Sequence, residues 1–401
     1  MYFTFKDQYE DFIVEEKLDY TPNGIWDAWH LFIEKKGINT MDIISHLTSN
    51  LPLKREDIGI AGLKDKEGIT RQRITIYKKK IKSCWGENTI LSLLREKCTI
   101  LKQSWHESPL MVWKNIGNSF KIRLRKRESL SPELKLQLEI NLEKSKKDWF
   151  PNVFGFQRFG KGNKNFKKAD KIFQEGINHP DTYEVKFKLQ SWGSMRFNEY
   201  CMQRREKGKH LMEWDILINS HNGFWAQVAY YQERKLHHFD YRKCKDQHQK
   251  SDFFSPDFET FTTDYNPERR WVTGPVLGWN QLLPPAWSKA SFFDQEIIKK
   301  SWFLNGGIAI SKKYHLYGFR RALVIKPENL ERERDNQDLT LSFSLPTGSY
   351  ASSFLAHILK NIDPKGCISN WLTIPRIILF VSFAHFSIGL LVLLLSILKN
   401  C

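Results

Sequence analysis

The chain has 401 residues, a formal net charge of +17 and an isoelectric point near 9.4, so it is long enough for two or three domains. Its 14 Trp, 13 Tyr and 28 Phe argue against a disordered basic tail. A folded, basic, aromatic-rich chain suits nucleic acid, because cations attract phosphates and rings stack on bases, although a basic protein without such a partner has the same composition.

The cysteine and glycine patterns bear on which metal, disulfide and nucleotide sites the chain could form. The six cysteines lie far apart, and the sequence has neither a Cys-x-x-Cys pair nor a His-Glu-x-x-His motif. Neither a zinc site nor a disulfide framework is therefore indicated. The glycine-rich loops that bind nucleotide phosphates or dinucleotides are also absent from the sequence. We expect a reaction that needs no metal, no nucleotide and no other cofactor.

Residues 1–80 have the pattern of mixed strands with one helix. Phe12 and Val14 alternate with charged side chains, which is typical of a half-buried strand. A helix is predicted over residues 41–47, because Asn39-Thr40 precedes it and Asp42 stands in its first turn.

A single carboxylate, Asp65, stands between Lys64 and Lys66 within residues 60–72. Apolar residues lead into this segment and an alternating segment follows it, which predicts a strand, a tight loop and a second strand. A carboxylate among cations stays ionised near neutral pH and can act as a nucleophile or a base. The alternative is an ordinary charged surface turn.

Two further elements are predicted before residue 150. Residues 120–127 alternate apolar and basic side chains, which predicts a strand with one cationic face. Both RNA contact and solvent exposure remain open for that face. Residues 133–147 have the spacing of an amphipathic helix.

Aromatic residues and glycines gather in residues 150–160. This segment holds Asn152, Phe154, Gly155 and Arg158. Its glycines permit close backbone approach, and a ring beside Asn and Arg can stack on an unstacked base while polar groups read the base edge. The alternative is a loop that is packed by its own rings.

The pattern of apolar and polar residues changes after the helix predicted over residues 191–206. Periodicity is weak between residues 208 and 300, and residues 273–278 form a turn-rich hinge before another predicted helical stretch. We therefore predict an inserted domain over about 180–318. Strand-like alternation then resumes, and a helix is predicted over residues 351–360.

The C-terminal residues 363–401 are strongly apolar. Residues 377–398 contain no Asp, Glu, Lys or Arg, and at 1.5 Å per residue a helix of this length would span a bilayer core. Three interpretations stay open: a transmembrane tail anchor, an extension without a selected role, and a buried helix.

Several motifs occur in the order that characterises one family. Over roughly residues 1–360 the chain resembles the TruD-type tRNA pseudouridine synthases. The matching stretches are Glu10-Asp-Phe-Ile-Val-Glu-Glu16, Gly62-Leu-Lys-Asp65 with Thr70-x-Gln72, Gly117-Asn118-x-Phe120, Asn152-x-Phe154-Gly155-x-Gln157-Arg158-Phe159-Gly160, Thr273-Gly274-Pro275 and Leu345-Pro-x-Gly-Ser-Tyr-Ala351.

The resemblance implies an α+β protein with the pseudouridine-synthase fold, built on a central antiparallel sheet. The catalytic domain would comprise residues 1–179 and 319–362, and the family's α/β insertion domain would comprise residues 180–318. Residues 363–401 would then be a hydrophobic extension beyond the family's usual end.

The resemblance also implies roles for individual residues. Asp65 falls on the family's catalytic Asp, Phe154 on its base-stacking Phe, and Asn152 on the Asn beside that ring. Lys6 falls on a basic active-site residue. Gly155, Arg158 and Lys64 complete the expected substrate-binding set.

The implied function is isomerisation of uridine to pseudouridine in tRNA, usually at uridine 13, without metal or cofactor. A different class is a catalytically inactive RNA-binding or RNA-chaperone protein that uses the same basic cleft. A third is a membrane-tethered scaffold. We expect a cytoplasmic protein, tethered to a membrane if residues 377–398 form the anchor, and the sequence indicates no oligomeric state.

Overall fold

The computed structural model describes most of the chain up to residue 362. The described ranges are 2–155, 158–160, 163–175, 179–206, 211–219, 227–240, 259–299, 306–335 and 338–362.

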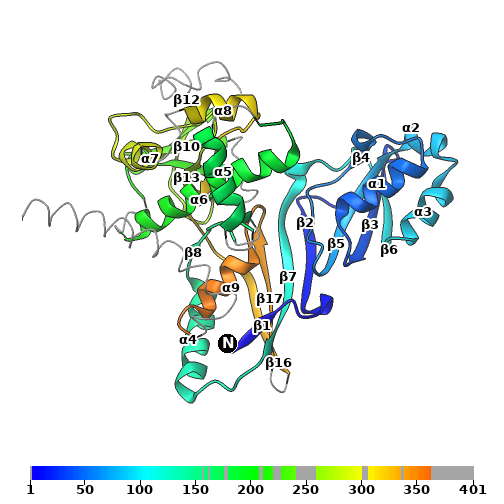
Figure 1. The fold of residues 1–401 in the computed structure, drawn as a ribbon, viewed down its shortest axis with the longest axis horizontal. Coiled ribbons are helices and arrows are strands. Elements are labelled where there is room, and N and C mark those ends of the chain that lie inside the picture. The colour runs from blue at the N-terminus through cyan, green and yellow to red at the C-terminus, as the bar shows by residue number, and fades with distance from the viewer. Residues whose placement is uncertain are drawn as a thin grey trace, which may run out of the picture.

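A nine-stranded sheet forms the centre and one end of the molecule (Figure 1). Its strands are β1 (Phe3–Phe5), β2 (Phe12–Leu18), β3 (Ala28–Lys36), β4 (Ile58–Gly59), β5 (Ile69–Tyr77), β6 (Thr99–His106), β7 (Asn115–Lys126), β16 (Glu328–Asp335) and β17 (Asp338–Pro346). The order is β16-β17-β7-β2-β5-β3-β6, with β1 paired to β7 and β4 paired to β5. Neighbours in it are antiparallel except β2 and β5, which run parallel with Ile13 opposite Ile69.

A second, six-stranded sheet has the order β12-β11-β10-β9-β13-β14. Its strands are β9 (Ile216–Asn219), β10 (Gln227–Gln232), β11 (Lys235–Asp240), β12 (Glu259–Asp264), β13 (Arg270–Val276) and β14 (Phe319–Ala322). Two short strands, β8 (Phe150–Pro151) and β15 (Val324–Ile325), pair with each other. The predicted insertion over 180–318 stays a prediction. The six-stranded sheet itself runs on to β14, because Thr273 pairs with Ala322.

Helices cover both sheets. They are α1 (Thr40–Asn50), α2 (Lys78–Ile81), α3 (Glu87–Arg95), α4 (Pro132–Lys147), α5 (Lys164–Glu175), α6 (Tyr183–Glu206), α7 (Lys289–Lys299), α8 (Ile308–Lys313) and α9 (Ala351–Leu359). Figure 1 shows α1 and α3 at the end of the large sheet formed by β3, β5 and β6, α4 and α9 beside β7 and β17, and α5–α8 around the second sheet. The α+β class is confirmed, and its large sheet is mixed rather than wholly antiparallel.

Three apolar cores hold these layers together. One lies between β3, β5, α1 and α3, where Leu31, Ile43 and Ile90 are fully buried. A second joins β7 and β17 to α4 and α9, and the third surrounds α6. Alternation explains the strand faces, since Ile122 and Leu124 of β7 point into the core while the basic residues between them point outward.

Local signals explain where the predicted helices begin. The Asp42 carboxylate accepts a hydrogen bond from the Asn39 backbone N–H, and α1 follows directly. Ser131 caps α4 in the opposite sense, because here the side chain of the N-cap residue accepts, with Ser131 Oγ 3.3 Å from the Leu134 backbone nitrogen. The observed α6 begins eight residues before the predicted helix at 191–206, whereas α3 and α5 were not predicted.

The C-terminal segment 363–401, with the predicted membrane span at 377–398, lies outside the described residues. In the ranges that the structure describes, no helix is both long and apolar enough to cross a membrane.

Candidate active site

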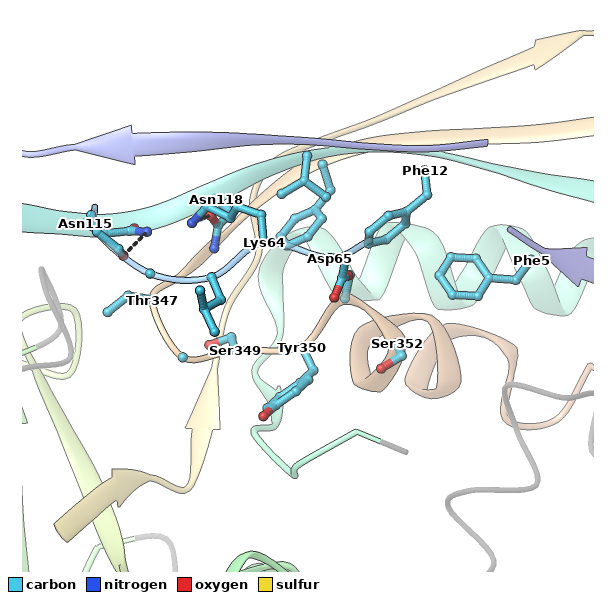
Figure 2. A pocket seen from close by; sticks show the side chains of 17 residues that line it. Phe5, Phe12, Lys64, Asp65, Asn115, Asn118, Thr347, Ser349, Tyr350 and Ser352 are labelled. Carbon is cyan, nitrogen blue, oxygen red and sulfur yellow. Dashed lines mark hydrogen bonds between the residues drawn. The ribbon is translucent and has the colours of Figure 1, made fainter. Parts of the chain in front are cut away.

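A cavity of about 250 Å³ opens beside the loop that joins β4 to β5 (Figure 2). It lies between this loop, the strands β2 and β7, and the residues that lead into α9. Asp65 projects into the space from one side, and Tyr350 and Ser352 face it from the other. The full lining is Phe5, Phe12, Val14, Ala61, Gly62, Leu63, Lys64, Asp65, Asn115, Asn118, Phe120, Thr347, Gly348, Ser349, Tyr350, Ala351 and Ser352.

Asp65 forms an ion pair with Lys6. The Lys6 Nζ lies 3.3 Å from Asp65 Oδ2, and the side chains are 8% and 39% exposed respectively. Lys6 follows β1 with a left-handed backbone (φ 62°), and its ammonium lies 3.9 Å from the centroid of the Phe12 ring. The carboxylate is thus accessible from the cavity, while its cation is largely hidden behind it.

A second lysine, Lys35, fixes the backbone of the Asp65 loop. Its buried ammonium donates to three carbonyl oxygens, those of Ile38 (2.8 Å), Lys64 (3.3 Å) and Asp65 (2.7 Å). Burial lowers the pKa of Lys35 to about 8. Because its hydrogen bonds go to main-chain atoms, Lys35 sets the position of the catalytic candidate without facing the cavity.

Lys64 lies in the cavity wall. Its ammonium is 3.3 Å from a buried carboxylate oxygen of Glu16 and donates to Asn118 Oδ1 at 3.0 Å. The Lys64 side chain is 7% exposed. This geometry favours a structural role for Lys64 over the predicted contact with RNA phosphate.

The opposite wall consists of residues 347–352, a turn followed by the start of α9. Gly348 has a φ of 77°, a conformation that glycine adopts readily. The buried guanidinium of Arg321 donates to Gly348 O at 2.7 Å and thereby holds this turn. Tyr350 is the aromatic residue of this wall that lines the cavity, and Figure 2 shows its hydroxyl end pointing away from Asp65.

Phe154 lies next to Tyr350 and is 7% exposed. The two ring centroids are 5.8 Å apart, and the Arg321 guanidinium lies 4.1 Å from the centroid of Phe154. Asn198 holds the Phe154 backbone from both sides, accepting from its N–H and donating to its carbonyl oxygen. The structure therefore brings Phe154 next to the cavity wall but not into the cavity lining.

Asn152 is also buried, and protein groups use both ends of its amide. Its Oδ1 accepts from Arg321 Nη2 at 2.7 Å, and its Nδ2 donates to Ala322 O at 3.2 Å. Gly155 packs so closely that a Cβ atom there would lie 3.3 Å from the Tyr350 ring and would overlap Ser352 Oγ. Both residues therefore shape the wall that carries Tyr350.

The remaining predicted cations lie away from the cavity. Arg158 is not part of the cavity lining and donates to Ser194 and Gln190 of α6. On β7, Arg125 donates to the buried carboxylate of Asp11 through two bonds of 2.8 Å. This ion pair gives Arg125 a structural role, which is neither of the two interpretations left open for the cationic strand, RNA contact and solvent exposure.

Three functional candidates were not identified from the sequence: Lys35, Arg321 and Tyr350. The signal for Lys35 was present, because it shares the inward face of β3 with the buried Ile33. Within the described ranges, no group of three or more His, Cys, Asp or Glu side chains lies close enough together to hold a metal ion. The arrangement offers a carboxylate supported by a cation at an aromatic-lined cavity, which can supply a nucleophile or a base.

Comparison with known proteins identifies relatives over most of the chain. The family model described as tRNA pseudouridine synthase D (TruD) matches residues 2–175 and 189–358. The tRNA pseudouridine synthase D of Wolinella succinogenes is 29% identical over 379 residues, covering 90% of this chain and 96% of the relative. That of Campylobacter jejuni is 33% identical over 368 residues, covering 88% and 92%. A Methanosarcina mazei crystal structure described as a tRNA pseudouridine synthase D (TruD) has the same fold, with a TM-score of 0.55, 17% identity, and coverage of 89% and 93%.

Proposed function

The chain belongs to the tRNA pseudouridine synthase D (TruD) family of isomerases, and we propose that it converts uridine 13 of tRNA to pseudouridine with Asp65 as the catalytic carboxylate. The family assignment supports the reaction and the substrate class. We choose uridine 13 because it is the usual target of the family that the motifs resemble. The choice of Asp65 rests on its place in the motif and in the cavity.

The reaction is an isomerisation, so its balance requires no outside reactant. The bond from the ribose anomeric carbon to N1 of uracil breaks, the base rotates, and a bond from the same carbon to C5 forms. The proton on C5 leaves and N1 ends protonated, with no net oxidation. The uridine must leave the base stack before any side chain can reach its ribose.

The observation that carries the proposal is the half-exposed Asp65 carboxylate with Lys6 behind it, 3.3 Å away. An ionised carboxylate there can attack the anomeric carbon of the ribose or remove a ribose proton. Both routes need the same placement, with the ribose near Asp65 and the detached uracil held in the cavity. The Lys6 cation orients the carboxylate on either route.

Aromatic rings around the cavity suit a detached uracil, because a planar base is held best between apolar faces. Tyr350 lines the cavity, and the Phe154 ring lies next to it, with the two centroids 5.8 Å apart. Because Phe154 is buried and is not part of the cavity lining, stacking of the base on Phe154 requires side chains of this wall to move when RNA binds. Asn152 and Gly155 would act by positioning this wall, since neither amide end of Asn152 is left for a base edge.

The test is pseudouridine formation in a total tRNA pool, mapped by position, with wild type, Asp65→Asn and Asp65→Ala compared. Asp65→Asn keeps the shape of the side chain and removes its charge. We expect wild type to modify position 13 and both variants to lose modification while still binding tRNA. Lys66→Ala, an exposed cation in the same loop, serves as the matched control.

The outcomes separate the parts of the proposal. Modification at a position other than 13 would show that the protein is a pseudouridine synthase with a different target uridine. Undiminished modification by Asp65→Asn would reject Asp65 as the catalytic group. If wild type binds tRNA and modifies no position, the protein is an RNA-binding or chaperone protein that uses the same cleft.

A further inference from the structure

A second cavity, of about 360 Å³, lies between α6, β13 and the β8–β15 pair. Figure 1 shows these elements side by side where the second sheet meets the rest of the molecule. Its volume is within the range of small-molecule sites. Several apolar side chains line it, and two tryptophans and three arginines join them: Trp149, Trp271, Arg204, Arg205 and Arg270.

The two tryptophans provide faces for a planar ligand. Trp149 and Trp271 are half-buried and meet edge to face, with ring centroids 6.1 Å apart. Trp271 Nε1 is buried and has no hydrogen-bond partner among the described residues. A nucleobase that stacks on an indole and offers an oxygen or a ring nitrogen to this N–H would satisfy both features.

The three arginines differ in exposure and in the partners that the structure gives them. Arg204 donates to both carboxylate oxygens of Asp215, at 2.9 and 2.7 Å, so this pair is neutral. Arg205 is exposed at the end of α6, and Arg270 is half-buried with its Nη2 3.3 Å from His238 Nδ1. Burial lowers the pKa of Arg270, and a nearby phosphate would offset the loss of solvation that causes this.

A basic groove runs from this cavity to the edge of the active-site wall. A larger cavity, of about 910 Å³, shares Trp149, Arg270 and Trp271 with it. This groove reaches Leu345 and Pro346, which directly precede Thr347 of the active-site wall. The charged residues that line the groove are five cations and two carboxylates: Lys17, Lys146, Arg269, Arg270, Lys326, Glu268 and Glu328.

We propose that the cavity between Trp149, Trp271, Arg205 and Arg270 binds one unstacked nucleoside of the tRNA, distant in the RNA from the reacting uridine. The base stacks on the tryptophans, and its phosphate lies against the two guanidiniums. The strand that leads to it follows the basic groove from the active site. This inference rests on the proposed function, because it takes tRNA as the substrate.

The test compares Arg205→Gln and Trp149→Leu in binding to two RNAs, with Asp65→Ala as the background so that no turnover occurs. One RNA is an intact tRNA, and the other is a short stem-loop that carries only the target uridine and its stem. Arg95→Gln is the matched control, because Arg95 is exposed on α3 at the far end of Figure 1. Thermal melting shows whether each variant is folded.

We expect Arg205→Gln and Trp149→Leu to weaken tRNA binding about tenfold, while stem-loop binding and the Arg95→Gln control stay unchanged. Arg205→Gln should also lower the slope of log Kd against log salt by about one, whereas Trp149→Leu should leave the slope unchanged. Wild-type tRNA affinity in Arg205→Gln, or an equal loss for both RNAs, would overturn the inference. Because Arg205 is exposed, we expect Arg205→Gln to fold. Its binding data therefore test the inference even if Trp149→Leu is unfolded. Failure of the proposed function would appear separately, as absent modification by wild type.

Discussion

The ammonium of Lys6 lies 3.3 Å from the Asp65 carboxylate, although 59 residues separate them in the chain. Lys6 reaches this position because β1 pairs with β7 at the edge of the cavity and its own backbone turns left-handed after the strand. The Lys6 side chain is 8% exposed, so its chemistry is directed at Asp65 rather than at solvent.

Lys6→Met is therefore expected to lower kcat for pseudouridine formation about 100-fold and to leave KM for tRNA nearly unchanged. The reason is that the carboxylate loses the cation that orients it, while no RNA contact is removed. Lys6→Arg should retain more activity, because the charge remains. Single-turnover kinetics measure the effect, and a raised KM with an unchanged kcat would instead make Lys6 an RNA-binding residue.

Lys35 should produce a stability change with pH. Its pKa is lowered to about 8 in the folded protein, against an ordinary value of 10.5, because burial disfavours the charged form. Between about pH 8 and 10.5 the unfolded chain thus holds a proton that the folded protein has lost. The Lys35 contribution to the free energy of unfolding therefore rises with pH through this window.

Urea unfolding at pH 7.5 and pH 9.5 measures this term. We expect the change in unfolding free energy between the two pH values to be about 2 kcal/mol more positive in wild type than in Lys35→Met. Lys97→Met, an exposed lysine after α3, should behave like wild type. An identical pH dependence in Lys35→Met would mean that Lys35 titrates normally despite its burial.

Arg321 supports the wall opposite Asp65, and lysine cannot replace it. Its guanidinium donates to Asn152 O at 2.9 Å, to Asn152 Oδ1 at 2.7 Å and to Gly348 O at 2.7 Å, and it covers the Phe154 ring. A lysine cannot reach these three acceptors from one position. Arg321→Lys should cost about 2 kcal/mol of stability, because a buried acceptor loses its donor. Thermal melting beside the surface control Arg95→Lys tests this, and equal melting temperatures would contradict it.

The sequence predicted the surroundings of Asp65 more accurately than the opposite wall of the cavity. Asp65 and Lys6 were assigned from local motifs that resemble those of the family, and both lie close to the ends of strands. Lys35 was missed although alternation put it on the inward face of β3, because a lysine in a charged stretch suggests a solvated position. Its partners are carbonyl oxygens of a loop about 30 residues away in the chain, which no local pattern reveals.

The geometry of the wall that contains Phe154 and Tyr350 depends on contacts between residues that are far apart in the chain. The segment that carries Phe154 was recognised, but its exposure was set by Arg321 and Tyr350, which follow it by more than 160 residues and pack over the ring. A sequence pattern can indicate a ring beside a glycine. It cannot tell which of two neighbouring rings faces the cavity.

Gly155 offers the last test of this wall. A Cβ atom at Gly155 would overlap Ser352 Oγ and lie 3.3 Å from the Tyr350 ring. Gly155→Ala should therefore displace Tyr350 and Ser352 in the cavity wall and lower kcat/KM about tenfold, which is a moderate cost for misplacing a side chain near the reacting atoms. Ser352→Ala alone should be nearly neutral, because Ser352 Oγ is buried and has no hydrogen-bond partner among the described residues.

The double variant Gly155→Ala/Ser352→Ala separates crowding from other causes. Removal of the Ser352 hydroxyl makes room for the new methyl group, so the double variant should recover most of the lost activity. The two changes would then be strongly non-additive in a double-mutant cycle, as expected for residues in contact. Additive losses would show instead that Gly155 is needed for its backbone and not for the space that it leaves to Tyr350 and Ser352.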